Sequence, residues 1–157
     1  MNHLRLMGIA LSLLLCSTYI SAQEKIPLNE PDNNRPRLFT NLPTSFSVDA
    51  KALSALFSDD VTVGKEVRLS LVNYESPFIG KVVSATSKYE NSVKSVVIRL
   101  SNFNGAALTL SSSTNPDGTV SFAGRIVSFK HGDTYELQQK GGLYMLTKKS
   151  FNELVIE

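Results

Sequence analysis

The sequence predicts a mainly β protein, a small antiparallel barrel or sandwich of about seven or eight strands with one short N-terminal helix. Three observations support this prediction. From Gly64 onward, apolar and polar residues alternate with the period of two that half-buried strands show. Turn-forming groups such as Asn104-Gly105 and Asn115-Pro116-Asp117-Gly118 separate these runs. One short stretch also occurs twice.

The repeated stretch is the best evidence for the architecture. Residues 78–84 and 122–128 both read Phe-x-Gly-(Lys/Arg)-(Val/Ile)-Val-Ser, and the second copy begins 44 positions after the first. In an extended strand, one face of each copy carries the Phe, the Gly and the following aliphatic residue, which are Phe78, Gly80, Val82, Phe122, Gly124 and Ile126. Each glycine leaves room for a neighbouring side chain or for a bend at a barrel corner. We interpret residues 38–157 as a single β domain with this duplicated strand unit.

The first 22 residues are typical of a secretory signal peptide. Arg5 precedes an apolar run from Leu6 to Cys16, which is too short for a membrane-spanning helix. The small residues at the end of the segment predict cleavage between Ala22 and Gln23. We therefore expect an exported protein (periplasm, cell surface or extracellular) with no transmembrane segment in the mature chain. The alternative is a protein anchored through a lipid on Cys16.

The segment after the signal peptide changes character twice. Residues 23–37 hold three prolines and few apolar residues, which is typical of a flexible linker or of a segment that threads along a partner. Residues 38–47 are more apolar, and Pro43 suggests an edge position. A helix is predicted over Ala50–Phe57, capped by Ser47 or Asp49, with its apolar stripe on the sheet.

The strands follow in order from Gly64. We expect them at Glu66–Val72, Phe78 to about Thr86, Val96–Leu100, Ala106–Leu110, Thr119–Ser128, Thr134–Gln138 and Leu143–Thr147, with a short closing strand in the tail to Glu157. Residues 73–77 and 87–92 are predicted as a turn and a polar loop.

Composition excludes several classes of function. A formal net charge of +2 on 157 residues offers no electrostatic footprint for nucleic acid. Beyond residue 22 the chain has no cysteine and a single histidine, His131, so we expect no zinc site, no other metal and no cofactor. The same scarcity argues against a serine triad or a cysteine dyad. We therefore expect a protein that is not an enzyme.

Aromatic and polar residues in the predicted turns are the candidates for contact with a partner. They are Tyr74, Tyr89, Phe103, Asn104, Phe129 and His131. Aromatic side chains at loop tips can anchor a partner protein, or they can fold back over the end of the barrel. Lys81 and Arg125, at matching places in the repeat, are expected to point outward into solvent.

The order of these residues resembles a known family. It is similar to the β-rich N-terminal pro-region of secreted bacterial zinc metalloproteases of the reprolysin-like, metzincin kind. The resemblance rests on the two Phe-x-Gly strands, Val96–Leu100, Asn104-Gly105 with Leu108-Thr109-Leu110, Asp133-x-Tyr135-x-Leu137 and Tyr144-x-Leu146. In that family the region precedes a catalytic domain with a His-Glu-x-x-His motif. This sequence contains no such motif, so the resemblance does not imply protease activity.

The functional expectation follows from the missing catalytic set and the resemblance. It is a secreted, non-enzymatic β domain that binds another exported protein, as a pro-domain-like inhibitor or chaperone of a protease. Two alternatives stay open: a β-barrel that binds a small ligand or a glycan, and a structural cell-envelope protein or lipoprotein.

Overall fold

The fold comes from a computed structural model that describes residues 34–150. The chain divides into two units, Met1–Asp32 and Asn33–Glu157, and the description concerns the second. The predicted signal peptide, its cleavage site after Ala22, the alternative lipidation of Cys16 and the closing strand in the tail lie outside the described residues.

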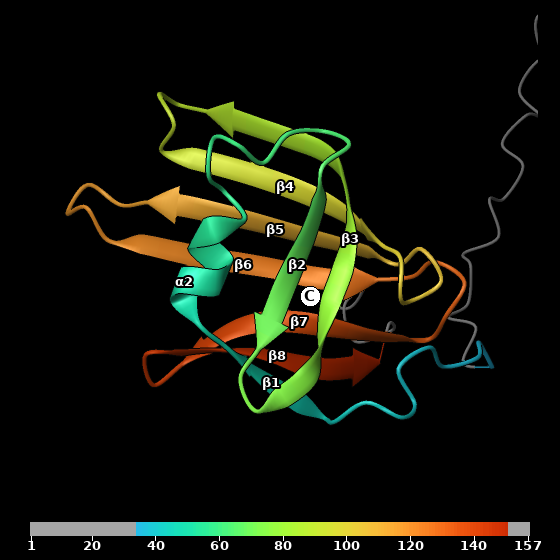
Figure 1. The fold of residues 1–157 in the computed structure, drawn as a ribbon. Helices are drawn as coiled ribbons and strands as arrows, with labels where there is room; N and C mark the ends of the chain where they lie inside the picture. Colours follow the sequence, from blue (N-terminus) through green and yellow to red (C-terminus); the bar gives the residue numbers. More distant parts are fainter. Residues whose placement is uncertain (1–33, 151–157) are drawn as a thin grey trace, which may run out of the picture. The chain divides into compact units, whose positions relative to one another are not determined.

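Eight antiparallel strands and one short helix make up the described domain (Figure 1). The elements are β1 (Ser45–Val48), α2 (Ala50–Ala55), β2 (Glu66–Leu71), β3 (Tyr74–Lys88), β4 (Val93–Leu100), β5 (Ala107–Thr114), β6 (Val120–Val127), β7 (Asp133–Lys140) and β8 (Leu143–Ser150). They form one sheet in the order β1-β8-β7-β6-β5-β4-β3-β2. An isolated bridge between Ser47 and Val72 joins the two ends of this order. The prediction of a mainly β fold is confirmed, and the sheet forms a nearly closed barrel.

Helix α2 lies at one end of the barrel (Figure 1). It begins at Asp49, whose carboxylate accepts the backbone N–H of Lys51 at 2.7 Å, as an N-cap residue does. Leu53 and Leu56 are buried, and the Phe57 ring stacks on Phe122 with 5.8 Å between centroids. The predicted apolar stripe therefore packs on the inside of the sheet, although the helix ends two residues earlier than predicted.

Inward-facing side chains fill the barrel. The fully buried ones are mostly aliphatic and aromatic and include Phe39, Leu69, Val82, Ile98, Leu108, Ile126, Tyr135 and Leu146. They form one continuous core with the buried residues of α2. The hydroxyl of Tyr135 donates to the carbonyl of Pro43. Burial raises the pKa of this phenol above its ordinary value, with the nearby Asp133 carboxylate as a secondary cause.

The glycines of the repeat lie where neighbouring strands approach each other closely. A Cβ on Gly80 would lie 2.3 Å from the Arg99 carbonyl oxygen, and one on Gly124 would lie 2.4 Å from that of Thr109. The two copies are β3 and β6, three strands apart in the meander, so they run in opposite directions. In both copies the glycine admits the backbone of a neighbouring strand, which is β4 for Gly80 and β5 for Gly124.

The structure corrects two of the predicted boundaries, at the start and at the end of β3. The turn predicted at residues 73–77 is limited to the region of Asn73, which has a φ of 59°, and β3 already begins at Tyr74. The polar loop predicted at 87–92 starts later, because β3 continues to Lys88 in register with β4. The segment predicted at a sheet edge contains β1, which is a terminal strand of the sheet order, pairs with β8 and is joined to Val72 by a single bridge.

The chain before β1 crosses the end of the barrel opposite to α2. The Asp133 carboxylate accepts backbone N–H groups of Leu38 at 2.6 Å and Phe39 at 2.8 Å. The Nζ of Lys148 donates to the carbonyls of Phe39 and Leu42 at 2.6 and 2.7 Å. These bonds hold the Phe39 ring over the core, where it contacts Phe103 and Tyr135.

Candidate functional site

Strand β3, with 15 residues, is much longer than the neighbouring strand β2. The six residues of β2 pair with β3 only between Tyr74 and Lys81. The contact continues for one more residue, because Val82 donates its N–H to the Lys65 carbonyl and accepts the N–H of Gly64. After a bulge at residues 82–84, β3 keeps its pairing with β4 but has no described strand on its other side. In Figure 1 this half of β3 is the uppermost strand of the picture.

The hydrogen-bond pattern identifies the backbone groups at this open side. Leu100 donates its N–H to the carbonyl of Ala106, directly before β5, and in an antiparallel sheet successive residues bond to opposite neighbours. On β4, residues 93, 95 and 97 therefore face β3 and bond its residues 88, 86 and 84. The N–H and C=O groups of Ala85 and Ser87 point the other way. No other residue in the described range bonds them, and we call these four groups the β3 edge.

The turn after β3 has an unusual backbone. Tyr89, Glu90 and Asn91 have φ values of 51°, 54° and 72°, so three successive non-glycine residues are left-handed. Such a conformation costs about 1–2 kcal/mol per residue for an L-amino acid other than asparagine or glycine. The Tyr89 side chain is 78% exposed, so no buried contact of its ring offsets this cost. The Ser92 N–H and hydroxyl both bond to the Tyr89 carbonyl and hold the turn closed.

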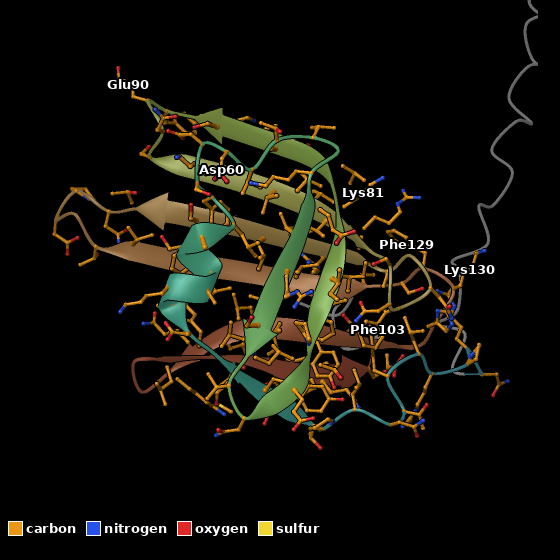
Figure 2. The ribbon with its side chains drawn as sticks, viewed as in Figure 1. Asp60, Lys81, Glu90, Phe103, Phe129 and Lys130 are labelled. Carbon is orange, nitrogen blue, oxygen red and sulfur yellow. The ribbon has the colours of Figure 1, made fainter. Side chains whose placement is uncertain are left out.

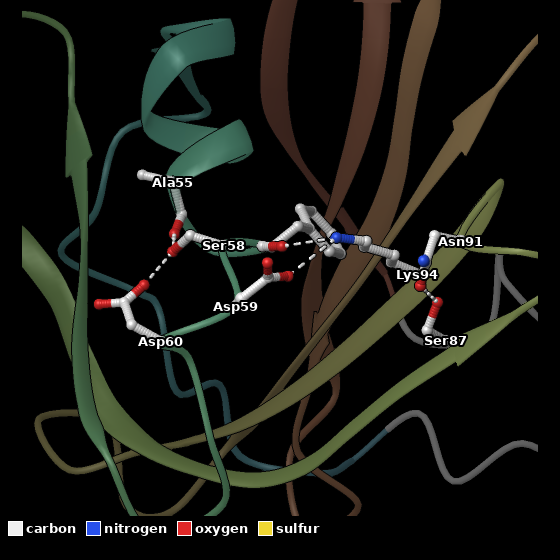
Figure 3. A network of polar contacts seen from close by, with 8 residues as sticks. Ala55, Ser58, Asp59, Asp60, Ser87, Asn91 and Lys94 are labelled. Atoms are coloured by element: carbon white, nitrogen blue, oxygen red, sulfur yellow. Dashed lines mark hydrogen bonds and ion pairs between the residues drawn. The ribbon is translucent and has the colours of Figure 1, made fainter.

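A groove runs between this hairpin and the loop that follows α2. Its volume is about 180 Å³, and its apolar wall is formed by Leu56, Phe57, Val61, Ala85 and Val96. Figure 3 shows the polar part, where the Lys94 Nζ lies 3.3 Å from the Phe57 carbonyl oxygen and 3.5 Å from the Asp59 carboxylate. Lys94 therefore ties the loop to β4.

The loop is also stiffened at Asp60. Its carboxylate accepts hydrogen bonds from the ammonium of Lys65 and the hydroxyl of Ser58. Figure 3 shows the Ser58 hydroxyl between this carboxylate and the Ala55 carbonyl, so the two acceptors share its single proton. The hydrogen bond from Lys65, followed by that from Ser58, lowers the pKa of Asp60 below its ordinary value. The loop after α2, which forms one wall of the groove, is therefore held in place by polar contacts of Lys94 and Asp60. The β3 edge, the turn Tyr89–Asn91 and the groove together are named the hairpin site.

Only one of the predicted contact residues, Tyr89, belongs to the hairpin site. Phe129 is 79% exposed but lies in the turn between β6 and β7 at the opposite end of the barrel, as its place beside Lys130 in Figure 2 shows.

Phe103 folds back over that end, with its ring 5.1 Å from that of Phe78, and the adjacent Asn104 is exposed with a φ of 47°. Tyr74 is half-buried and meets the Phe46 ring edge-on at 4.8 Å.

His131 makes a local contact in the turn after β6. Its Nδ1 lies 2.7 Å from the hydroxyl of Ser128, a residue that is itself buried. No carboxylate within residues 34–150 bonds the imidazole, so the third member of a triad is missing from the described part of the chain. Nor do three His, Cys, Asp or Glu side chains come together anywhere in that part as metal ligands. None of the described helices is long and apolar enough to cross a membrane.

Sequence reasoning missed most of the hairpin site. Ala85 and Ser87 have small side chains that carry no functional signal, and their importance lies in backbone groups left open by a shorter neighbour. In the sequence, nothing distinguishes Lys94 from other lysines expected on the surface. The one available signal was the unequal length of the two predicted strands, because a long strand beside a short one must leave part of its edge unpaired.

Comparison with protein-family models, curated proteins and solved structures gave no match to this chain.

Proposed function

We propose that this chain is an exported, non-enzymatic domain that binds another exported protein, as a pro-domain-like inhibitor or chaperone of a protease. The contact is made by the hairpin site. The observation that carries the proposal is the turn at Tyr89, where a bulky exposed aromatic side chain is presented on a left-handed backbone.

Two physical arguments support a binding role for this turn. Strained backbone persists when the surrounding structure enforces it, and it concentrates at functional sites. Exposed tyrosines are among the residues that most often dominate binding energy at protein interfaces. Here the strain and the aromatic side chain coincide in Tyr89, at the tip of a hairpin that the long strand β3 carries away from β2.

The filled barrel favours a surface contact over a ligand inside the barrel. A barrel that carries an apolar molecule keeps an internal cavity, whereas here Leu108, Ile126 and Tyr135 are completely buried in a continuous core. The groove of about 180 Å³ is smaller than the roughly 300–1,000 Å³ of ordinary small-molecule pockets. The resemblance to metalloprotease pro-regions suggests the class of partner.

The test uses the chain from Gln23 onward with purified exported metalloproteases of the same organism. Casein hydrolysis measures inhibition, and the yield of active protease after dilution from urea measures assistance in folding. The proposal expects that at least one protease is slowed, or is recovered in higher yield, at near-stoichiometric ratios. Unchanged hydrolysis and unchanged recovery at large molar excess contradict it.

Matched variants locate the contact. Tyr89→Ala is expected to weaken the effect at least tenfold, because it removes the exposed anchor. Phe129→Ala, which truncates an equally exposed aromatic side chain at the other end of the barrel, is expected to leave it unchanged. If Phe129→Ala abolishes the effect and Tyr89→Ala does not, the binding site is at the opposite end.

A second candidate function is binding of a small ligand or glycan on the outer face. A hollow of about 700 Å³ is lined there by Glu66, Lys81, Val83, Arg99 and Ser101. Lys81 and Arg99 are direct cross-strand partners, and two like charges in this position repel each other. An acidic sugar or another carboxylate would relieve that repulsion. Titration with glucuronate, followed by the amide signals of Lys81 and Arg99, tests this candidate.

Export and anchoring are part of the proposal. Intact mass of the protein from its native host distinguishes cleavage before Gln23 from a lipid on Cys16. A mass that includes a diacylglyceryl group on Cys16 would favour the lipid-anchored, cell-envelope alternative.

A further inference from the structure

We infer that the β3 edge binds an extended segment of the partner protein, which adds to the sheet as a strand beside Ala85 and Ser87. This inference rests on the proposed function and specifies how the hairpin site recognises its partner.

The backbone groups of the edge select for an extended chain. Ala85 and Ser87 each present one N–H and one C=O in the plane of the sheet, two residues apart. An antiparallel segment that pairs with both residues would make four hydrogen bonds, the arrangement found when peptides add to exposed sheet edges. Val82 already shows this type of bonding, because its N–H and C=O are both taken by the chain before β2.

The groove specifies one side chain of the incoming segment. Ala85 is in register with buried Val96 and Ser87 with Lys94, so both side chains lie on the inner face of the hairpin. A residue of the partner that pairs with Ala85 places its own side chain on that same face. This face opens onto the groove beside Phe57 and Val61, which Ala85 is too small to fill. We therefore expect an aliphatic side chain at that position of the partner.

The occupant is a partner protein and not a second copy of this chain. Two copies that paired edge to edge would place Ala85 and Ser87 of one copy at the groove of the other, and these side chains would leave it empty. Such a pairing would bring together mostly the Ser, Thr and Ala side chains of residues 84–87, whereas the binding energy of protein interfaces is concentrated in large anchoring side chains. A partner strand with an aliphatic residue in the groove satisfies both the backbone and the cavity.

The probe is a phage-displayed library of random linear 12-residue peptides, selected on the full chain from Gln23 onward. Enriched peptides are synthesised and their affinity is measured for the native protein and two variants. Ala85→Pro removes the edge N–H without removing a bond to β4, because proline is tolerated where the N–H of an edge strand faces outward. Ala85→Ser is the matched control, because it keeps the backbone donor.

The inference expects enriched peptides with alternating aliphatic residues that lose at least tenfold in affinity for Ala85→Pro and less than twofold for Ala85→Ser. Circular dichroism and the midpoint of thermal unfolding verify that both variants are folded. If Ala85→Pro is unfolded, Ser87→Pro takes its place. A library without enriched binders, or binders insensitive to Ala85→Pro, overturns the inference. A dimer in light scattering that Ala85→Pro dissociates would also overturn it, because the edge would then hold a second copy.

These outcomes separate this inference from the proposed function. If peptides bind through the edge while every protease is unaffected, strand addition stands and the protease partner is wrong. If a protease is inhibited equally by the native protein and Ala85→Pro, the proposed function stands and the edge is not its means of contact.

Discussion

Gly80 and Gly124 meet the neighbouring strand in the same way. Gly80 is in register with Leu100 and its Cβ position points at the carbonyl of the preceding Arg99, whereas Gly124 is in register with Leu110 and points at the carbonyl of Thr109. The distances of 2.3 and 2.4 Å are shorter than any Cβ contact allows. The repeat in the sequence therefore corresponds to a repeat in local packing, in which each glycine lets two strands approach closely inside the barrel.

Replacement of either glycine by alanine is expected to destabilise the fold. The added methyl group must displace backbone, so we expect a loss of about 1–3 kcal/mol in the free energy of unfolding for Gly80→Ala and Gly124→Ala. Urea denaturation measures this loss. Gly118→Ala is the comparison, because nothing lies within 4 Å of its Cβ position and only its positive φ opposes the change. Equal midpoints for Gly124→Ala and the native protein would contradict the packing argument.

The carboxylate of Asp133 is expected to hold the segment before β1 in place. Asp133→Ala leaves the N–H groups of half-buried Leu38 and buried Phe39 without this acceptor, which costs about 1–3 kcal/mol for a buried group and less for a half-buried one. We expect a large drop in unfolding free energy together with faster amide exchange at both residues. The unfolding free energy of Asp133→Asn, which keeps one acceptor oxygen, should lie between that of the native protein and that of Asp133→Ala. If exchange at Leu38 and Phe39 stays slow in Asp133→Ala, other contacts anchor the segment.

Strain in the hairpin turn is expected to be released by glycine. Glu90 is exposed with a φ of 54°, so Glu90→Gly removes a steric cost without removing a packed side chain. We expect a gain of up to about 1 kcal/mol in unfolding free energy, less the entropy that glycine loses on folding. Glu90→Ala controls for the loss of the carboxylate and should not stabilise. A glycine variant that is no more stable than the alanine variant would show that the turn is unstrained.

The ion pair between Glu136 and Lys149 predicts a dependence of stability on pH. The two side chains meet at 2.6 Å, and the hydrogen bond from Lys149 lowers the pKa of Glu136 below its ordinary value of 4.5. The stabilisation is therefore complete above the ordinary carboxyl pKa and is lost as the pH falls through the lowered pKa of the folded state. Both side chains are partly exposed, so its size is about 0.5–1 kcal/mol.

Comparison with Glu136→Gln isolates this contribution. The difference in unfolding free energy between the native protein and the variant is expected to be largest near neutral pH and to shrink below about pH 4.5. Urea denaturation at a series of pH values measures it. A difference that stays constant from pH 7 to pH 3 would mean that the pair does not titrate with folding.

The regular parts of the fold could be predicted because alternation reports burial directly. Leu108 and Leu110 alternate with half-buried residues, and both lie in the core of β5 as the period of two requires. The two copies of the repeat lie in β3 and β6, where each glycine faces the backbone of a neighbouring strand. The boundaries of β3 were wrong because Tyr74–Pro77 and Ser87–Lys88 are rich in turn-forming residues. Their pairing with β2 and β4 outweighs that local preference.

The candidate site was harder to predict because it depends on the lack of a described neighbouring strand beside the second half of β3. The open backbone at Ala85 and Ser87 arises from the early end of the pairing with β2, which is a tertiary relationship. The aromatic residues in turns gave a mixed result for the same reason. Tyr89 and Phe129 are exposed. Phe103 instead packs on Phe78, because the turn that carries Phe103 lies over the end of the barrel next to Phe39.

Residue-by-residue amide hydrogen exchange in β3 is the most direct test of strand addition at the β3 edge, first in the free protein and then in complex with an inhibited exported metalloprotease. In the free protein we expect slow exchange at Ser84, Thr86 and Lys88, which bond to β4, and fast exchange at Ala85 and Ser87. Binding should slow exchange at Ala85 and Ser87 and leave the turn at Phe129 unaffected. Strand addition at the β3 edge would be contradicted if Ala85 and Ser87 were already as protected as their neighbours in the free protein, or if their exchange remained fast in the complex.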